Sequence, residues 1–336
     1  MSALDEIKSR AHVDIDQLDP KTAQQLGPFC DMTSNQALIA AVVTSDPESA
    51  IVKDAVARAK KDTKSHDEAV ELALDLLAVL LAKAVFPHIS GRVHAQLSPR
   101  FSHSVSGSVE HGHRLVALFE ENGISRSRVC LKIPATGAGI AAAAQLEGEG
   151  IRTLATTLFS VDQAFAAVQA KCLYIAPYFN ELSAVLEPET WKEYENTATE
   201  HPMGPVISQI VKLFRGIENR PLIMPACIVT STEALAISTL GVDHITIAAK
   251  VLQALAEDKE VKNFRGGETT TSAKDSGMVP ESRTKESHST DYLVDGGKAL
   301  DENIAANKSV ARRLDYAIKA FADCEQKVMD LVRSKL

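Results

Sequence analysis

Short apolar stretches alternate with longer helical patterns along most of this chain. Eight stretches of β-branched or apolar residues each precede a segment with helical periodicity, and they cover residues 12–16, 28–34, 88–97, 129–135, 153–159, 173–179, 221–228 and 244–248. Strands that alternate with helices indicate a parallel sheet. Eight such units predict a (β/α)8 TIM barrel, an α/β fold, and we expect one barrel domain over residues 1–336.

Further segments lie outside these eight units. Residues 265–290, which are rich in Ser, Thr, Gly and Lys, predict a loop. Residues 301–334 have the apolar spacing of a long C-terminal helix, whose inward face would carry Ile304, Val310, Leu314, Ile318, Phe321 and Val328. The most apolar run, residues 69–86, contains three charged residues, so it predicts a buried helix and not a membrane span.

Composition narrows the classes of function. Of the 336 residues 45% are hydrophobic, and the formal net charge is −8. No basic stripe with interleaved aromatic residues is present, so we expect no nucleic-acid partner. The five cysteines form no C-x-x-C pair, which argues against a zinc site or a disulfide framework and favours reduced thiols inside a cell. There is no G-x-x-x-x-G-K loop, and we expect neither a metal nor an organic cofactor.

The two ends of the chain bear on localisation. The first ten residues contain no apolar segment of the kind found in secretory signals. The last three residues, Ser334, Lys335 and Leu336, match the S-K-L address that a peroxisomal import receptor reads. We therefore expect a peroxisomal location if this tail is exposed, and a cytoplasmic one if the match is a coincidence.

One charged residue interrupts the expected fourth strand, VCLKIPA, at residues 129–135. Side chains alternate between the two faces of a strand, so Lys132 shares with Cys130 the face that points into the barrel, and Leu131 points toward the helices. Burial lowers the pKa of a lysine, and a neutral amine can attack a carbonyl to form a Schiff base. The alternatives are a buried ion pair with a carboxylate and a side chain that reaches the barrel rim.

Several segments carry a resemblance to a known family. The stretch LKIPATGAGIAAAAQLEGEGI, residues 131–151, resembles the Schiff-base segment of the transaldolases, in which a Lys on strand 4 precedes a Thr-x-x-Gly-Ile loop and an E-x-E-G-I helix end. DMTSNQALI at 31–39 is similar to the family's D-A-T-T-N-P-S-L-I. TLFSVDQAFAA at 157–167 and DHITIA at 243–248 resemble its strands 5 and 8, and Asp16 with Asp19 fits its strand 1 motif.

The resemblance implies a class I aldol-type enzyme. Lys132 would attack the ketone of a sugar phosphate, and cleavage of a carbon–carbon bond would leave a dihydroxyacetone unit on Lys132 for transfer to an aldehyde. Asp16 would be the acid/base, Asn35 would hold the donor's hydroxyl groups, and Thr156 would orient a catalytic water. From the residues alone, Asp16 could instead be a helix N-cap or loop carboxylate, Asn35 an Asx turn, and Thr156 a residue chosen for strand propensity.

The chain departs from the family at positions that handle protons. The family's strand 3 reads S-T-E-V-D-A-R-L-S, and Arg92 stands where its Glu activates the catalytic water. A guanidinium cannot relay a proton in that way. Arg92 could lower the pKa of Lys132, bind a substrate carboxylate, or pair with Asp14, Asp16 or Glu181. Tyr178 replaces the family's Phe, and because related fructose-phosphate aldolases use a Tyr hydroxyl nearby, it could act as an acid/base or simply fill the core.

The chain also departs from the family at positions that hold phosphate. Glu181 and Val229 stand where the family has its two phosphate-binding arginines, and Leu154 and Ala176 replace its strand 5 Asn and strand 6 Ser. Arginine–phosphate pairs are strong charge-assisted contacts. Their loss argues against ordinary sugar phosphates as good substrates.

Three hypotheses of function remain. The first is a Schiff-base enzyme that acts on a non-standard carbonyl or sugar substrate in biosynthetic metabolism. The second is a genuine peroxisomal transaldolase of the pentose-phosphate pathway, and the third is a non-catalytic relative that binds a metabolite. The resemblance also allows a homodimer, since many members of the family form one.

Overall fold

The computed structural model describes residues 2–257 and 290–336, so the predicted loop at 265–290 lies almost wholly outside the described residues. The strands are β1 His12–Asp16, β2 Met32–Thr33, β3 Val93–Gln96, β4 Val129–Pro134, β5 Thr153–Leu158, β6 Tyr174–Pro177, β7 Leu222–Ile223 and β8 His244–Ala248. The α-helices are α1 Ala3–Lys8, α2 Pro20–Leu26, α3 Gln36–Ser45, α4 Ala50–Asp62, α5 His66–Val85, α6 Val105–Glu121, α7 Gly137–Gly148, α8 Val161–Gln169, α9 Ser183–Leu186, α10 Thr197–Glu200, α11 Met203–Phe214, α12 Ser231–Ser238, α13 Ala249–Glu257, α15 Lys298–Ala306 and α16 Lys308–Arg333.

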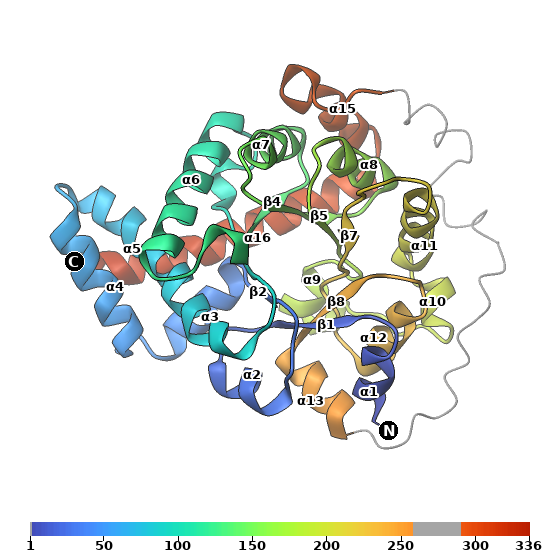
Figure 1. Ribbon diagram of the computed structural model, residues 1–336, viewed down its shortest axis with the longest axis horizontal. Coiled ribbons are helices and arrows are strands. Elements are labelled where there is room, and N and C mark those ends of the chain that lie inside the picture. Colours follow the sequence, from blue (N-terminus) through green and yellow to red (C-terminus); the bar gives the residue numbers. More distant parts are fainter. Residues whose placement is uncertain (1, 258–289) are drawn as a thin grey trace.

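The strands are parallel and follow the order β7-β6-β5-β4-β3-β2-β1-β8 (Figure 1). Backbone hydrogen bonds from Asp243 N–H to the Ile223 carbonyl and from Thr246 N–H to the Pro225 carbonyl link β8 to the region of β7. The sheet is therefore nearly closed, and the predicted TIM-barrel α/β fold is confirmed.

Polar residues at the ends of the strands start the barrel helices. Thr136, Ser160 and Thr230 each accept a hydrogen bond from the backbone N–H three residues on and so cap α7, α8 and α12. These helix N-termini gather at the carboxyl ends of the strands, the face on which TIM-barrel active sites lie.

The outer face of β4 packs against helices. Leu131 contacts the region of α6 and α7, and a Cβ added at Gly112 of α6 would lie 3.1 Å from a Leu131 methyl group. Glycine at this position lets α6 approach the sheet closely.

The C-terminal helix is a correction to the sequence analysis. The single helix expected at 301–334 is two helices, α15 and α16, which meet at Asn307. The Asn307 side chain accepts a hydrogen bond from the Val310 N–H and caps α16, so it ends one helix and starts the next. Of the predicted inward residues, Ile318 is only partly buried, and the others are buried: Ile304, Val310, Leu314, Phe321 and Val328.

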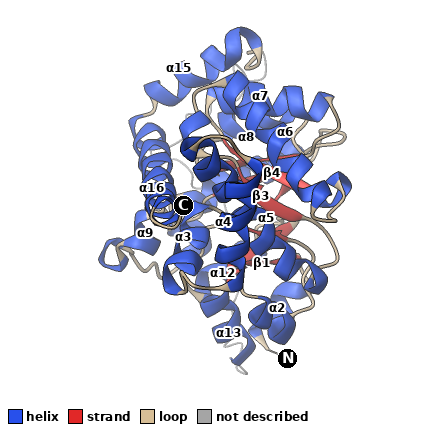
Figure 2. Ribbon diagram, turned by 90° about the vertical axis from the view of Figure 1, so that its left-hand side faces the viewer, coloured by secondary structure: helices blue, strands red, loops and turns tan. Residues whose placement is uncertain are grey.

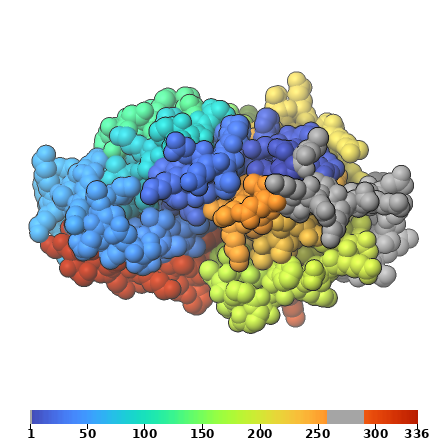
Figure 3. All heavy atoms as spheres, turned by 90° about the horizontal axis from the view of Figure 1, so that it is seen from below, coloured from blue at the N-terminus to red at the C-terminus, as the bar shows by residue number. Residues whose placement is uncertain are grey.

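The helix α16 runs along one side of the barrel (Figure 2). It packs against α3 and α5 and reaches the end of β5. In the space-filling view its red surface lies beside the light-blue surface of α4 and α5 (Figure 3). No helix in the described part of the chain is long and apolar enough to cross a membrane.

Candidate active site

Lys132 lies in the barrel interior, on the face of β4 opposite Leu131. Its side chain is 1% exposed, and burial lowers its pKa. The negative charge of Asp16 acts in the opposite direction, followed by the thiols of Cys130 and Cys227. Among the described residues no carboxylate forms an ion pair with Lys132. A buried amine without such a partner is suited to nucleophilic attack.

Asp16 ends β1 and faces the same interior. Its carboxylate accepts a hydrogen bond of 2.6 Å from the Thr33 hydroxyl, which in turn lies 2.6 Å from the Thr246 hydroxyl. The cap of α2 is Asp19, so Asp16 is free of that structural role. A carboxylate whose charge acts on the Lys132 amine is placed to exchange protons with a group bound there.

Thr156 and Tyr178 follow at the carboxyl ends of β5 and β6. Burial raises the pKa of Tyr178 far above its usual value, while the nearby Thr156 hydroxyl acts the other way. The hydroxyl groups of Thr156 and Tyr178 do not form a hydrogen bond with each other. Thr156 Oγ1 has no hydrogen-bond partner among the described residues. Burying a hydroxyl without a partner costs free energy, so Thr156 is suited to bind a substrate group or water.

Two strained residues flank these side chains. Thr157 has φ of 51° and Cys227 has φ of 60°, values that a β-branched residue in particular rarely adopts. The register between β5 and β6 shifts between Ala155 and Leu158, which turns Thr157 out of the regular strand. Strain of this kind is concentrated at functional sites.

Asn35 stands at the N-terminus of α3 and is 8% exposed. Its Oδ1 accepts a hydrogen bond of 3.0 Å from the Leu38 N–H and caps the helix. Its Nδ2 group makes no hydrogen bond to a described residue. The amide can therefore cap α3 and still donate to a substrate.

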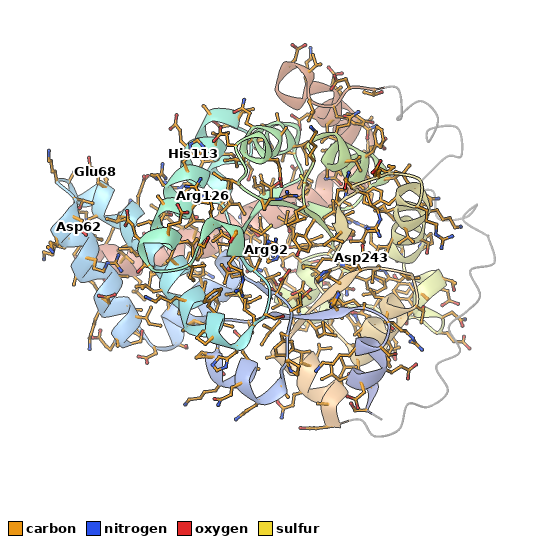
Figure 4. All side chains as sticks on the ribbon, in the orientation of Figure 1. Asp62, Glu68, Arg92, His113, Arg126 and Asp243 are labelled. Carbon is orange, nitrogen blue, oxygen red and sulfur yellow. The ribbon has the colours of Figure 1, made fainter. Side chains whose placement is uncertain are left out.

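Arg92 lies at the other end of the barrel interior. In the strand register Gln96 is the neighbour of Lys132. Arg92 comes four residues before Gln96, so its backbone lies about 13 Å further along the strand. Arg92 forms no ion pair in the described part of the chain, so the three carboxylate pairings that the sequence allows are absent. Figure 4 shows Arg92 toward the centre of the molecule, whereas Asp62 and Glu68 project from its edge.

A buried network closes the amino end of the barrel. Asp14 accepts hydrogen bonds from the Asp31 N–H at 2.7 Å and from His244 Nδ1 at 2.9 Å, and Asp31 lies 3.0 Å from His94 Nε2. Burial raises the pKa of Asp14 to about 6. Burial alone would lower the pKa of His244, but the Asp14 carboxylate raises it. The network thus balances buried carboxylates with imidazoles.

Part of this network has donor atoms that a metal ion could use. The ligand atoms of Asp14, Cys30, Asp31 and His244 lie within 4.8 Å of one another. Both carboxylates are already satisfied by backbone N–H groups and imidazoles. The hydrogen bonds account for the cluster without an ion.

Glu181, just after β6, pairs with arginines of α16. Arg312 donates two hydrogen bonds of 2.7 Å to its two oxygens, and Arg313 Nε donates one of 3.1 Å. The hydrogen bond from Arg312 is the largest influence that lowers the pKa of Glu181, so its carboxylate is ionised at neutral pH. The family has an arginine where this chain has Glu181. Here the positive charges at this place come from Arg312 and Arg313 of α16.

Sequence reasoning missed Arg312, Arg313 and Cys227. The two arginines precede Leu314, a residue predicted to face inward, which was the one available signal that they lie near the barrel. Cys227 is partly buried, and the charges of Lys132 and Glu181 are among those that influence its pKa. No glycine or asparagine marked the positive φ of Cys227 or Thr157.

Comparison with known proteins agrees with this geometry. The model of the family described as Transaldolase/Fructose-6-phosphate aldolase matches residues 9–331. The chain belongs to this family. It is 27% identical to a transaldolase of Acidobacterium capsulatum, over 94% of this chain and 96% of that protein. It is 28% identical to Transaldolase 2 of Salmonella paratyphi A and to Transaldolase A of Salmonella typhimurium, over the whole of each chain.

Membership of the transaldolase family makes this chain an aldolase-type enzyme. The predicted resemblance is confirmed, and it extends over nearly the full length of the transaldolases compared. An identity of 27–28% to transaldolases supports a common fold and reaction type. The substrate depends on the particular residues of the site.

Proposed function

We propose that the enzyme forms a Schiff base through Lys132 and makes or breaks a carbon–carbon bond next to it. The observation that supports this most is the Lys132 amine itself, which is 1% exposed, lacks an ion pair in the described chain and has a lowered pKa. Burial that favours the neutral form of the amine, beside the carboxylate of Asp16, is an arrangement that suits Schiff-base catalysis.

The neighbouring residues divide the remaining tasks. Lys132 attacks the substrate carbonyl, and loss of water gives the protonated imine. Asp16 then takes the proton of the hydroxyl group on the carbon to be released, the carbon–carbon bond breaks, and its electron pair moves into the imine to form an enamine. Asn35 donates to donor hydroxyl groups, and Thr156 holds the water that later hydrolyses the imine. Tyr178 supplies an additional buried hydroxyl for proton transfer.

The substrate in this proposal is a carbonyl compound other than an ordinary sugar phosphate, used in biosynthetic metabolism. Glu181 and Val229 provide no phosphate-binding arginine on the strands, and the Glu181 carboxylate occupies donors of Arg312 and Arg313 that a phosphate would need. Arg92 stands at the position of the family's Glu but cannot accept a proton, so activation of the water falls to other groups. The second candidate is a genuine transaldolase that moves dihydroxyacetone between sugar phosphates, and it is favoured by the full-length match to transaldolases.

Trapping experiments test both candidates. The protein would be incubated with fructose 6-phosphate, dihydroxyacetone and unphosphorylated ketones and aldehydes, reduced with borohydride, and digested for mass measurement of the Lys132 peptide. We expect a reduced adduct on Lys132 that disappears in Lys132→Ala. Turnover of fructose 6-phosphate with erythrose 4-phosphate would favour the genuine transaldolase. A folded protein that gives no adduct with any compound would support a non-catalytic, metabolite-binding relative.

We also propose that Ser334, Lys335 and Leu336 act as a peroxisomal address. The S-K-L sequence supports this. In the structure Lys335 pairs with Glu48, and the Leu336 carbonyl accepts a hydrogen bond of 2.9 Å from Lys60. Recognition by an import receptor would therefore require the tail to leave α4.

A further inference from the structure

The helix α16 brings two guanidinium groups to the end of the barrel where the strands supply none. Arg312 and Arg313 both bond to Glu181, which follows β6. The two arginines differ in exposure, because the Arg312 side chain is 61% exposed and the Arg313 side chain only 10%. Arg313 is therefore the inner residue of the pair, and Arg312 is the outer one.

Arg313 is buried with part of its hydrogen-bonding capacity unused. Only its Nε donates to Glu181, and neither terminal nitrogen makes a hydrogen bond to a described residue. Burial lowers the pKa of Arg313, which reflects the cost of removing its charge from water. A guanidinium presents five donors in a planar fork that matches a carboxylate or phosphate. An anion between the free donors would offset the cost of burial.

The surroundings connect Arg313 to the Schiff-base lysine. Its guanidinium lies 5.9 Å from the centre of the Phe159 ring, and Phe159 packs edge-on against Tyr178 at 5.9 Å. Phe159 directly follows β5. On the other side, Cys227 Sγ lies 3.7 Å from the Glu181 carbonyl, and the charge of Lys132 acts on the same thiol. The arginine and the lysine thus border one region at the carboxyl ends of β5, β6 and β7.

The local charge selects the kind of anion. Within the ion-pair cluster, two guanidinium groups against one carboxylate leave a net charge of +1, which matches a monoanion. The buried Glu233 carboxylate acts on Cys227 as Glu181 does, and it adds to the repulsion of a second negative charge. A phosphate carries nearly two negative charges at neutral pH, and Glu181 stands beside the arginines to repel the second. We propose that Arg313, with Arg312, binds a carboxylate at the end of the substrate remote from the carbonyl group. This inference rests on the proposed Schiff-base function and names its substrate class, a keto acid.

Matched acids and esters test the carboxylate site. The probes are methyl ketones with a terminal carboxylate, levulinate and its two next longer homologues, each beside its methyl ester. We expect half-maximal trapping on Lys132 at a concentration at least tenfold lower for the best acid than for its ester. Arg313→Gln should remove this difference, so that the acid and its ester reach half-maximal trapping at similar concentrations. Lys319→Gln, an exposed change on the same helix, should behave as wild type.

Changing the charge of the site provides an independent test. Glu181→Gln raises the net charge to +2, and we expect it to improve trapping of fructose 6-phosphate at least tenfold relative to fructose. Equal trapping of acid and ester by the wild-type protein, or an acid preference that survives in Arg313→Gln, would overturn the carboxylate site.

Failure of the two proposals can be told apart. Adducts with dihydroxyacetone and the esters, but no preference for acids, would refute the carboxylate site and leave the Schiff base intact. No adduct with any probe would refute the Schiff base. Calorimetric titration of Lys132→Ala with the same acids then measures the anion site alone, and binding no weaker in Lys132→Ala/Arg313→Gln would refute it.

Discussion

Single residues set the reactivity of this site through burial and a few charges. Burial lowers the pKa of Lys132 more than the charge of Asp16 raises it, so the net shift favours the neutral amine. Asp16 therefore has two opposing effects. It supplies an acid/base group, and it holds the pKa of the nucleophile above the value that burial alone would give.

Removing the Asp16 charge should move the pH dependence of Schiff-base formation. Because Asp16 raises the pKa of Lys132, we expect Asp16→Asn to lower that pKa and shift the midpoint of dihydroxyacetone trapping to lower pH. Cyanoborohydride trapping at a series of pH values measures the midpoint separately from the maximal rate. Asp19→Asn, which changes the cap of α2, serves as the control. An unchanged midpoint in Asp16→Asn would show that the two groups are not coupled.

The buried network at the amino end makes a second residue-level prediction. His244→Ala leaves the Asp14 carboxylate buried without its imidazole, and we expect a loss of about 3–5 kcal/mol in the free energy of unfolding at neutral pH. Urea denaturation measures it. The exposed pair of His113 and Glu149 provides the contrast, since His113→Ala should cost about 1 kcal/mol or less. Similar losses in both variants would mean that the network contributes no more than a surface pair.

At the level of elements, the sequence predicts the order of strands better than their lengths. The eight apolar runs correspond to the eight strands, but β2 and β7 are only two residues long. Asp31 N–H bonds to the Asp14 side chain instead of a neighbouring strand, and Pro225 has no N–H to give to the sheet. Such long-range and backbone effects are not visible in local periodicity.

The candidate site shows the same limit. Strand alternation singled out Lys132, and the resemblance to the transaldolases brought forward Asp16, Asn35 and Thr156, which lie in segments similar to those of the family. Arg313 could not be found in this way, because its partner Glu181 is 132 residues away in sequence. The break at Asn307 did have a local signal, an asparagine three residues before Val310, the pattern of a helix N-cap.

Docking of α16 should depend on pH through Glu181. The pKa of Glu181 is lower in the folded protein than in the unfolded chain. Its carboxylate therefore stabilises the fold at any pH above the pKa of the unfolded chain, and this stabilisation is lost as the pH falls through the pKa of the folded protein. We therefore expect Glu181→Gln to cost about 1–2 kcal/mol at neutral pH, the lower part of the range for hydrogen bonds to charged groups, because the Arg312 side chain is largely exposed to water. The difference from wild type should shrink at acidic pH, below the ordinary Glu range, in urea titrations. A difference that is independent of pH would assign the loss to packing instead of charge.

At the scale of the whole molecule, the chain uses its last helix for several tasks. The helix α16 covers α3 and α5 with its apolar face, brings Arg312 and Arg313 to Glu181, and ends beside α4. Its two ends thus connect the site with the C-terminal tail. The tail contacts that fix the end of the helix compete with any receptor that must bind Ser334, Lys335 and Leu336.

This competition predicts that the folded protein binds the import receptor more weakly than a free peptide of the same tail. Lys60→Ala removes one hydrogen bond to the Leu336 carbonyl, worth about 0.5–1.5 kcal/mol, so we expect it to strengthen receptor binding by roughly 2- to 10-fold. Titration of the purified receptor domain with wild type, Lys60→Ala and peptide measures this order. Lys61→Ala, a change of an exposed residue on the same helix, is the control. In cells, an N-terminal fluorescent fusion should reach peroxisomes and lose that location when residues 334–336 are deleted. If deletion leaves the distribution unchanged, the tripeptide is no address, and the tail serves only to hold α16 against α4.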